Sequence, residues 1–85
     1  MTAAAPEWLT KRGGTLALNT MGPGWVVLLD GQPQYVLTPR PAGGQLTCEV
    51  MQSVNGRRLG SGTTHASEDE AIRGGLDDLR QALGW

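Results

Sequence analysis

Residues 57–71 read RRLGSGTTHASEDEA, which we interpret as a strand that runs through a glycine-rich bend into the start of a helix. Ser67 and Glu70 have the S-x-x-E spacing of a capping box, in which the serine oxygen accepts the N–H of the later residue. A glycine-rich loop before a helix can also bind phosphate. Here, however, the acidic side chains of Glu68, Asp69 and Glu70 already occupy the positive end of the helix dipole. The spacing matches no nucleotide-binding motif either, so the bend is interpreted as a structural corner.

The helix that follows is expected over residues 67–83. Its apolar residues are spaced four, three and four apart and form one stripe, made of Ile72, Leu76, Leu79 and Leu83. Gly75 lies beside this stripe, where the missing side chain would let the helix approach a sheet closely. Gly74 is expected to point outward.

Before the bend, the sequence predicts a β-meander over residues 15–65. The strand segments are TLALNTM at 15–21, WVVLLD at 25–30, YVLTP at 35–39 and QLTCEVMQ at 45–52. Turn residues separate them, with PRPAGG at 39–44 expected to form a rigid turn. Asn55-Gly56 predicts a two-residue type I′ hairpin that pairs Gln52 with Leu59 and Val50 with Ser61.

The order of these elements predicts an α+β fold, a four- to five-stranded antiparallel meander with one C-terminal helix packed on one face in two layers. The 85 residues form a single domain, 1–85, in which residues 1–5 are expected to be a frayed tail and residues 6–14 a short helical turn.

Composition narrows the class of protein. The net charge of −1 does not favour a dominant polyanion-binding role, and the single cysteine, Cys48, excludes an internal disulfide. The sequence shows neither a secretory leader nor an apolar run long enough to cross a membrane. We therefore expect a soluble cytoplasmic protein that acts without a membrane and without a cofactor.

The segment WVVLL at 25–29 is apolar on both faces of its strand. A helix over one face leaves the other to be covered, either by the N-terminal Trp8 and Leu9 or by a second copy or a different protein. We hypothesise a protein-binding or homodimerising surface on the sheet face or edge carrying these anchors: Trp25, Val27, Leu29, Tyr35 and Leu37.

An alternative function is binding of nucleic acid through a small basic patch. Its candidate residues are Lys11, Arg12, Arg40, Arg57 and Arg58. Residues 1–58 hold five basic and three acidic side chains, whereas residues 59–85 hold two basic and five acidic ones. A basic surface must therefore come mainly from the first part of the chain.

The residues offer little for catalysis. His65 is the one histidine, and Cys48 lies on a neighbouring predicted strand, yet no third group is available to orient a thiol–imidazole pair. A metal site built from His65, Glu68 and Asp69 has too few nitrogen or sulfur ligands to be closed. We therefore expect no catalytic site, no metal site and no enzymatic activity.

Residues 33–83, PQYVLTPRPAGGQLTCEVMQSVNGRRLGSGTTHASEDEAIRGGLDDLRQAL, resemble the β-β-β-α half of a double-stranded-RNA-binding domain. The resemblance rests on the strand order, the Gly-x-Gly at the end of a strand and the serine-capped helix. It implies a β-β-β-α topology. Domains of that family place lysines after the cap serine to bind RNA phosphates, whereas Glu68 and Asp69 occupy those positions here and Arg73 is the nearest basic residue.

Overall fold

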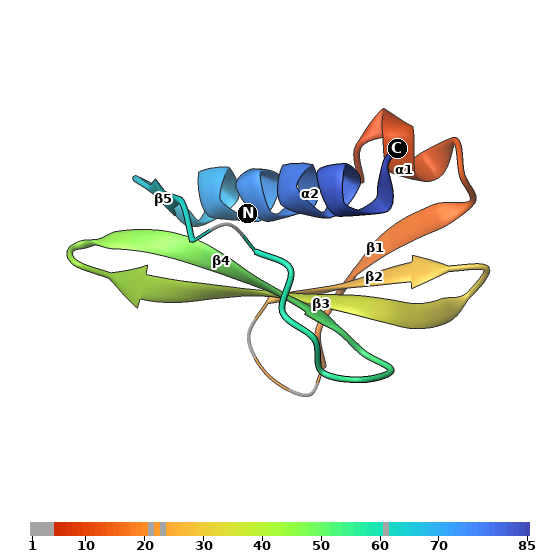
Figure 1. Cartoon of the computed structure of the whole chain (residues 1–85), viewed down its shortest axis with the longest axis horizontal. Coiled ribbons are helices and arrows are strands. Elements are labelled where there is room, and N and C mark those ends of the chain that lie inside the picture. The colour runs from red at the N-terminus through yellow and green to blue at the C-terminus, as the bar shows by residue number, and fades with distance from the viewer. Residues whose placement is uncertain (1–4, 21, 23, 61) are drawn as a thin grey trace.

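The computed structural model describes residues 5–20, 22, 24–60 and 62–85. The five strands form one antiparallel sheet in the order β1-β2-β3-β4-β5, with the helices on one side of it (Figure 1). The predicted α+β meander with a C-terminal helix is therefore confirmed. The elements are α1 (Glu7–Thr10), β1 (Gly14–Leu18), β2 (Trp25–Leu29), β3 (Gln32–Ala42), β4 (Gln45–Gln52), β5 (Thr64–His65) and α2 (Glu68–Leu83).

Two tight turns join the three central strands. Asp30 and Gly31, both with positive φ, connect β2 to β3, and Gly43 and Gly44 connect β3 to β4. The second turn is shorter than the expected PRPAGG turn, because β3 continues to Ala42. Pro39 and Pro41 are tolerated in β3 because β2 pairs with β3 only as far as Leu37. Beyond that residue, a missing N–H on the β2 side costs no ladder hydrogen bond.

The turn after β4 is wider than the type I′ hairpin expected at Asn55-Gly56. Among the described non-glycine residues Asp30 has a positive φ, and Asn55 does not. The N–H of Gln52 donates to the carbonyl of Arg57 at 2.7 Å, which leaves four residues in the loop. The register therefore differs by two residues from the expected one. An even shift preserves the face of each side chain, so Leu59 stays on the core side; Ser61 lies outside the described residues.

Helix α2 begins and ends as the sequence predicts. The Oγ of Ser67 accepts the N–H of Glu70 at 3.3 Å. At the other end Gly84 has φ 73°, and its N–H donates to the carbonyl of Gln81. The N–H of Trp85 donates to the carbonyl of Arg80 at 3.1 Å. These two bonds form a Schellman motif, which needs a residue with positive φ at the glycine position.

Two adjacent glycines let α2 lie close to the sheet. A Cβ on Gly75 would come within 3.0 Å of the Cβ of Cys48, so the expected close approach is confirmed. A Cβ on Gly74 would come within 2.7 Å of the imidazole of His65. The expectation that Gly74 points outward is therefore wrong, because β5 brings His65 against this side of the helix.

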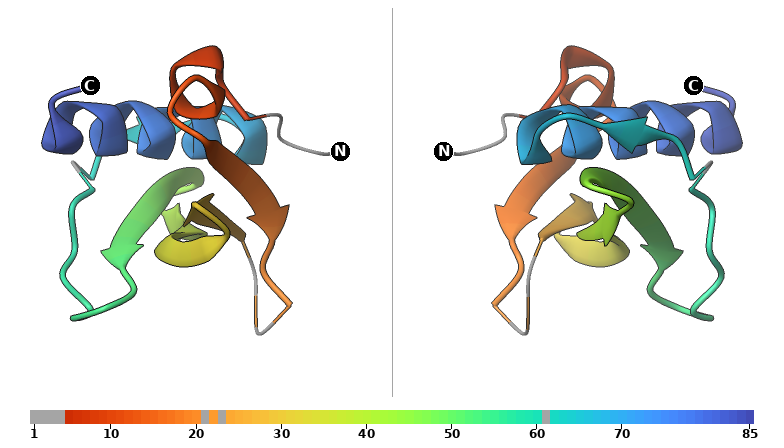
Figure 2. Two further views of the ribbon diagram at one scale, coloured as in Figure 1. Left: turned by 90° about the vertical axis from the view of Figure 1, so that its right-hand side faces the viewer. Right: turned by 90° about the vertical axis from the view of Figure 1, so that its left-hand side faces the viewer.

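The core fills the space between the sheet and both helices. Figure 2 shows α1 and α2 on the same side of the twisted sheet. Leu9 of α1 is fully buried in the same cluster as Leu37, Ile72 and Leu79. The N-terminal segment thus adds to the layer of α2 and does not fold across the opposite face. Ala5, expected in a frayed tail, packs against this core, and the remainder of that tail lies outside the described residues.

Candidate functional site

The expected anchor residues lie on the covered face of the sheet. Val27 and Leu37 have no exposed surface, and Tyr35 is 6% exposed. Trp25 and Leu29 are half-buried and pack against the same core. A side chain without exposed surface cannot contact a partner, so Val27, Tyr35 and Leu37 are corrected from interface residues to core residues.

The opposite side of the sheet, which we call the open face, carries the alternate residues of the same strands. Because successive side chains of a strand point to opposite faces, the neighbours of Val27, Leu37 and Val50 point away from the helices. None of these neighbours belongs to the core cluster or packs against it among the described residues. The open face consists of Thr15, Ala17, Val26, Leu28, Val36, Thr38, Arg40, Thr47, Glu49, Met51 and Arg58.

An apolar stripe crosses the middle of the open face. Val36 of β3 lies opposite Val26 of β2 on one side and opposite Met51 of β4 on the other, and Leu28 extends the stripe along β2. All four side chains are half-buried, because neighbours on the same sheet face shield one another. The stripe is therefore continuous over three strands.

A charged cluster borders the stripe. The two carboxylate oxygens of Glu49 each bind a different guanidinium, that of Arg40 at 2.6 Å and that of Arg58 at 3.3 Å. The Glu49 side chain is 19% exposed, whereas those of Arg40 and Arg58 are 58% and 74% exposed. The cluster carries a net positive charge, and one carboxylate holds both arginines in place at this side of the face.

The residues of the expected basic patch do not form one surface. Arg40 and Arg58 are joined through Glu49, while Arg57 follows the turn after β4. Lys11 and Arg12 lie on the helix side of the sheet, beside α1. The patch is therefore divided between the two sides of the sheet, and each part contains a carboxylate.

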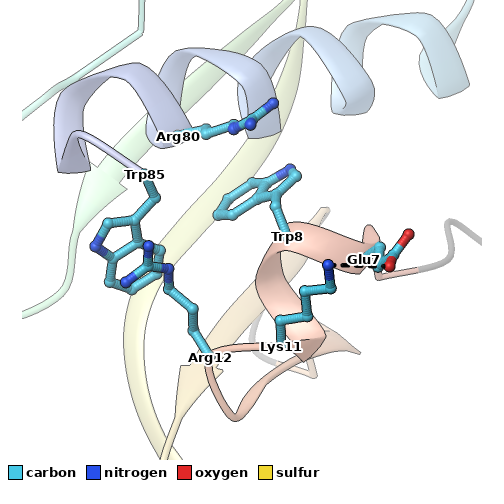
Figure 3. A pocket seen from close by; sticks show the side chains of 6 residues that line it. All are labelled: Glu7, Trp8, Lys11, Arg12, Arg80 and Trp85. Carbon is cyan, nitrogen blue, oxygen red and sulfur yellow. Dashed lines mark ion pairs between the residues drawn. The ribbon is translucent and has the colours of Figure 1, made fainter.

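Lys11 and Arg12 instead line a hollow of about 690 Å³ between α1 and the C-terminal end of α2, which we call the tryptophan hollow (Figure 3). Its lining consists of Glu7, Trp8, Lys11, Arg12, Arg80 and Trp85. Sequence reasoning missed Arg80 and Trp85 as site residues. The available signal was the Gly84-Trp85 pair, because a Schellman glycine is commonly followed by an apolar residue that packs back on the helix.

The structure makes Cys48 a poor nucleophile. Its side chain is 5% exposed and lies under Gly75 of α2. Burial raises the pKa of the Cys48 thiol to about 11, with smaller contributions in the same direction from Asp78 and Glu49. A thiol with this pKa stays protonated at neutral pH, and the thiolate is the reactive form.

His65 pairs with Leu46 across β4 and β5 and packs against Gly74.

In the parts of the chain that the structure describes, no three histidine, cysteine or acidic side chains are grouped in a way that could hold a metal ion. Over the same residues, no helix has the length and apolar character needed to span a bilayer. The lack of a cofactor and of enzymatic activity remains a prediction from the sequence.

Comparison with protein-family models, curated proteins and solved structures gives no match to this chain. The resemblance of residues 33–83 to a double-stranded-RNA-binding domain therefore also remains a prediction.

Proposed function

We propose that this protein is a small non-enzymatic module that pairs with a second copy of itself through the open face. The observation that carries the proposal is the apolar stripe of Val26, Leu28, Val36 and Met51, which neither helix covers. A sheet with one uncovered apolar face is stabilised when a second layer excludes water from it.

The free buried Cys48, which needs no oxidising compartment, supports a cytoplasmic location.

The dimensions of the molecule suit a face-to-face dimer. It measures 36 × 26 × 26 Å, so one whole face is close in size to the roughly 800 Å² that each partner buries in a standard interface. Most homodimers have two-fold symmetry, in which the same patch serves on both copies. The open face would supply such a patch.

The charge distribution of the open face favours a second copy. The Arg40–Glu49–Arg58 cluster lies on the β3–β4 side, whereas the β1 side carries the uncharged Thr15 and Ala17. A two-fold axis that runs along the strands sets the cluster of one copy opposite the uncharged side of the other. Like charges then do not meet, and the two apolar stripes face each other.

Sedimentation equilibrium of the purified chain over a range of concentrations tests the proposal. We expect a monomer–dimer equilibrium that Val36→Glu shifts toward monomer by at least about 100-fold in Kd, because a carboxylate would be buried without a partner. Val54→Glu is the matched control, since Val54 is 79% exposed in the turn after β4 and lies off the open face. It should leave the equilibrium unchanged.

A second variant separates loss of pairing from loss of folding. Val36→Thr keeps a β-branched side chain of similar shape in the strand and replaces one methyl group by a hydroxyl. It should retain the circular dichroism spectrum of the wild type and still weaken the dimer. A wild-type chain that stays monomeric at the highest concentration, or equal effects of Val36→Glu and Val54→Glu, would overturn the proposal.

A further inference from the structure

The tryptophan hollow is built on rigid elements. Leu9 anchors α1 in the core, and Gly14 allows the close contact, because a Cβ at Gly14 would overlap the Leu9 side chain. On the other wall, the Schellman motif fixes the backbone of Trp85 against the last turn of α2. Both walls are thus set by the fold.

Two indole rings meet inside the hollow. The ring centroids of Trp8 and Trp85 are 6.2 Å apart, and their planes cross at 63°, an edge-to-face arrangement. The guanidinium of Arg12 lies over the Trp85 ring, 4.7 Å from its centroid. Two of the three tryptophans of the chain therefore lie in one open hollow, where their ring surfaces can contact a planar ligand.

The hollow is positively charged although the chain is not. The side chains that line it include three cations and one carboxylate, whereas the side chains of the whole chain sum to a net charge of −1. Glu7 is engaged by Lys11 at 3.3 Å. Neither Arg12 nor Arg80 has an ion-pair partner among the described residues. These two guanidinium groups remain available to an anion, and Figure 3 shows them on either side of the indole pair.

The surroundings indicate where an anionic group would lie. A smaller hollow of about 410 Å³ adjoins the first, shares Arg80 and Trp85 with it, and is lined by the carboxylate of Asp77. That carboxylate repels an anion from the smaller hollow. A phosphate is therefore expected in the tryptophan hollow, whose cationic side chains are those of Lys11, Arg12 and Arg80.

We propose that the tryptophan hollow binds a nucleoside monophosphate unit, either as a free nucleotide or within a single strand. Every nucleobase offers a flat aromatic surface that stacks on an indole, and arginine binds phosphate through paired N–H groups. A purely acidic ligand would use the cations and leave the indoles without a role. This site lies on the helix side of the molecule and is independent of the open face.

Nuclear magnetic resonance of the ¹⁵N-labelled protein reads the site directly, since each tryptophan gives its own indole N–H signal. On titration with AMP, the signals of Trp8 and Trp85 should shift and that of Trp25, which packs on the sheet, should stay. Adenosine and inorganic phosphate, titrated separately, should each bind about tenfold more weakly than AMP. Adenosine can stack on the indoles but has no phosphate, and inorganic phosphate can bind the cations but has no ring.

Substitutions on one helix supply the matched control. Arg80→Gln should weaken AMP binding about tenfold through loss of a charge-assisted hydrogen bond. Arg73→Gln, which removes the same charge from an exposed position earlier in α2, should have no effect. Trp85→Leu keeps an apolar residue after the Schellman glycine and removes the ring, so the fold should persist while AMP binding falls.

A short oligothymidylate distinguishes the two sources of the ligand. Binding tighter than that of TMP, with affinity that falls steeply with salt, assigns the hollow to a single strand. Equal affinity assigns it to a free nucleotide. Unshifted Trp8 and Trp85 signals with both AMP and the oligonucleotide, phosphate binding as tight as AMP, or equal losses from Arg73→Gln and Arg80→Gln would overturn the proposal.

Discussion

The two faces of this sheet place alternate residues of the same strands in different surroundings. On the covered face, Val27, Leu37 and Val50 have no exposed surface and lie beneath the helices. On the open face, Val26, Val36 and Met51 are only half-buried, and an ion-pair cluster borders them. The helix layer covers one apolar face and leaves the other open (Figure 2). The proposed pairing of two copies would use this open face.

Val26 and Val27 are identical residues that are adjacent on β2 and point to opposite faces. Val27→Ala should lower the free energy of unfolding by about 2 to 3 kcal/mol, through lost burial and a residual cavity. Val26→Ala should cost less than about 1 kcal/mol in the monomer. The loss of strand propensity is the same in both variants, so it cancels from the difference.

Urea denaturation measures both variants at a protein concentration below that of dimer formation, so that association does not add to the apparent stability. Equal losses from the two variants would break the comparison, since they would mean that something also covers Val26 within one chain.

The contact between α2 and the sheet offers a second test of the covered face. Gly75→Ala should destabilise the protein by about 1 to 2 kcal/mol, because crowding of the buried Cys48 exceeds the gain of about 1 kcal/mol in helix propensity. Gly74→Ala should cost less, since the half-buried ring of His65 can turn aside. Thermal unfolding of both variants checks the order, which the reverse ranking would contradict.

Much of the fold could be predicted from local chemistry. The capping serine, the apolar stripe of α2 and the terminal glycine each depend on residues within one or two helical turns. The turns were harder to predict. Positive-φ pairs occur at Asp30-Gly31 and Gly43-Gly44 but not at Asn55-Gly56. Asp-Gly and Asn-Gly satisfy the same local preference, and strand pairing decides between them.

The candidate sites could be predicted only in part. The two reasons are the alternation of side chains along a strand and the long sequence separation of residues that meet in space. The doubly apolar WVVLL segment predicted that one helix would leave a second apolar face for another segment or another chain to cover, but periodicity assigns alternate residues to two faces without saying which one the helix covers. The tryptophan hollow joins Trp8 and Trp85 from opposite ends of the chain. No local sequence pattern predicts such a contact, and Trp8 was expected only as a possible cover for the sheet.

The ion pairs of the open face should contribute little to stability, and their removal tests whether that face matters to folding at all. Glu49→Gln removes the partner of both Arg40 and Arg58, whose side chains are exposed enough to regain water. The free energy of unfolding should therefore fall by less than about 1 kcal/mol.

Glu7→Gln breaks the more exposed pair with Lys11, in which both side chains are more than two-thirds exposed, and should cost less still. Added salt should narrow the gap between the two variants, because it screens exposed charges. A loss from Glu49→Gln as large as that from Val27→Ala would mean that the charged cluster stabilises the monomer as the core does. The proposed division, in which the covered face stabilises the fold and the open face pairs two copies, would then be wrong.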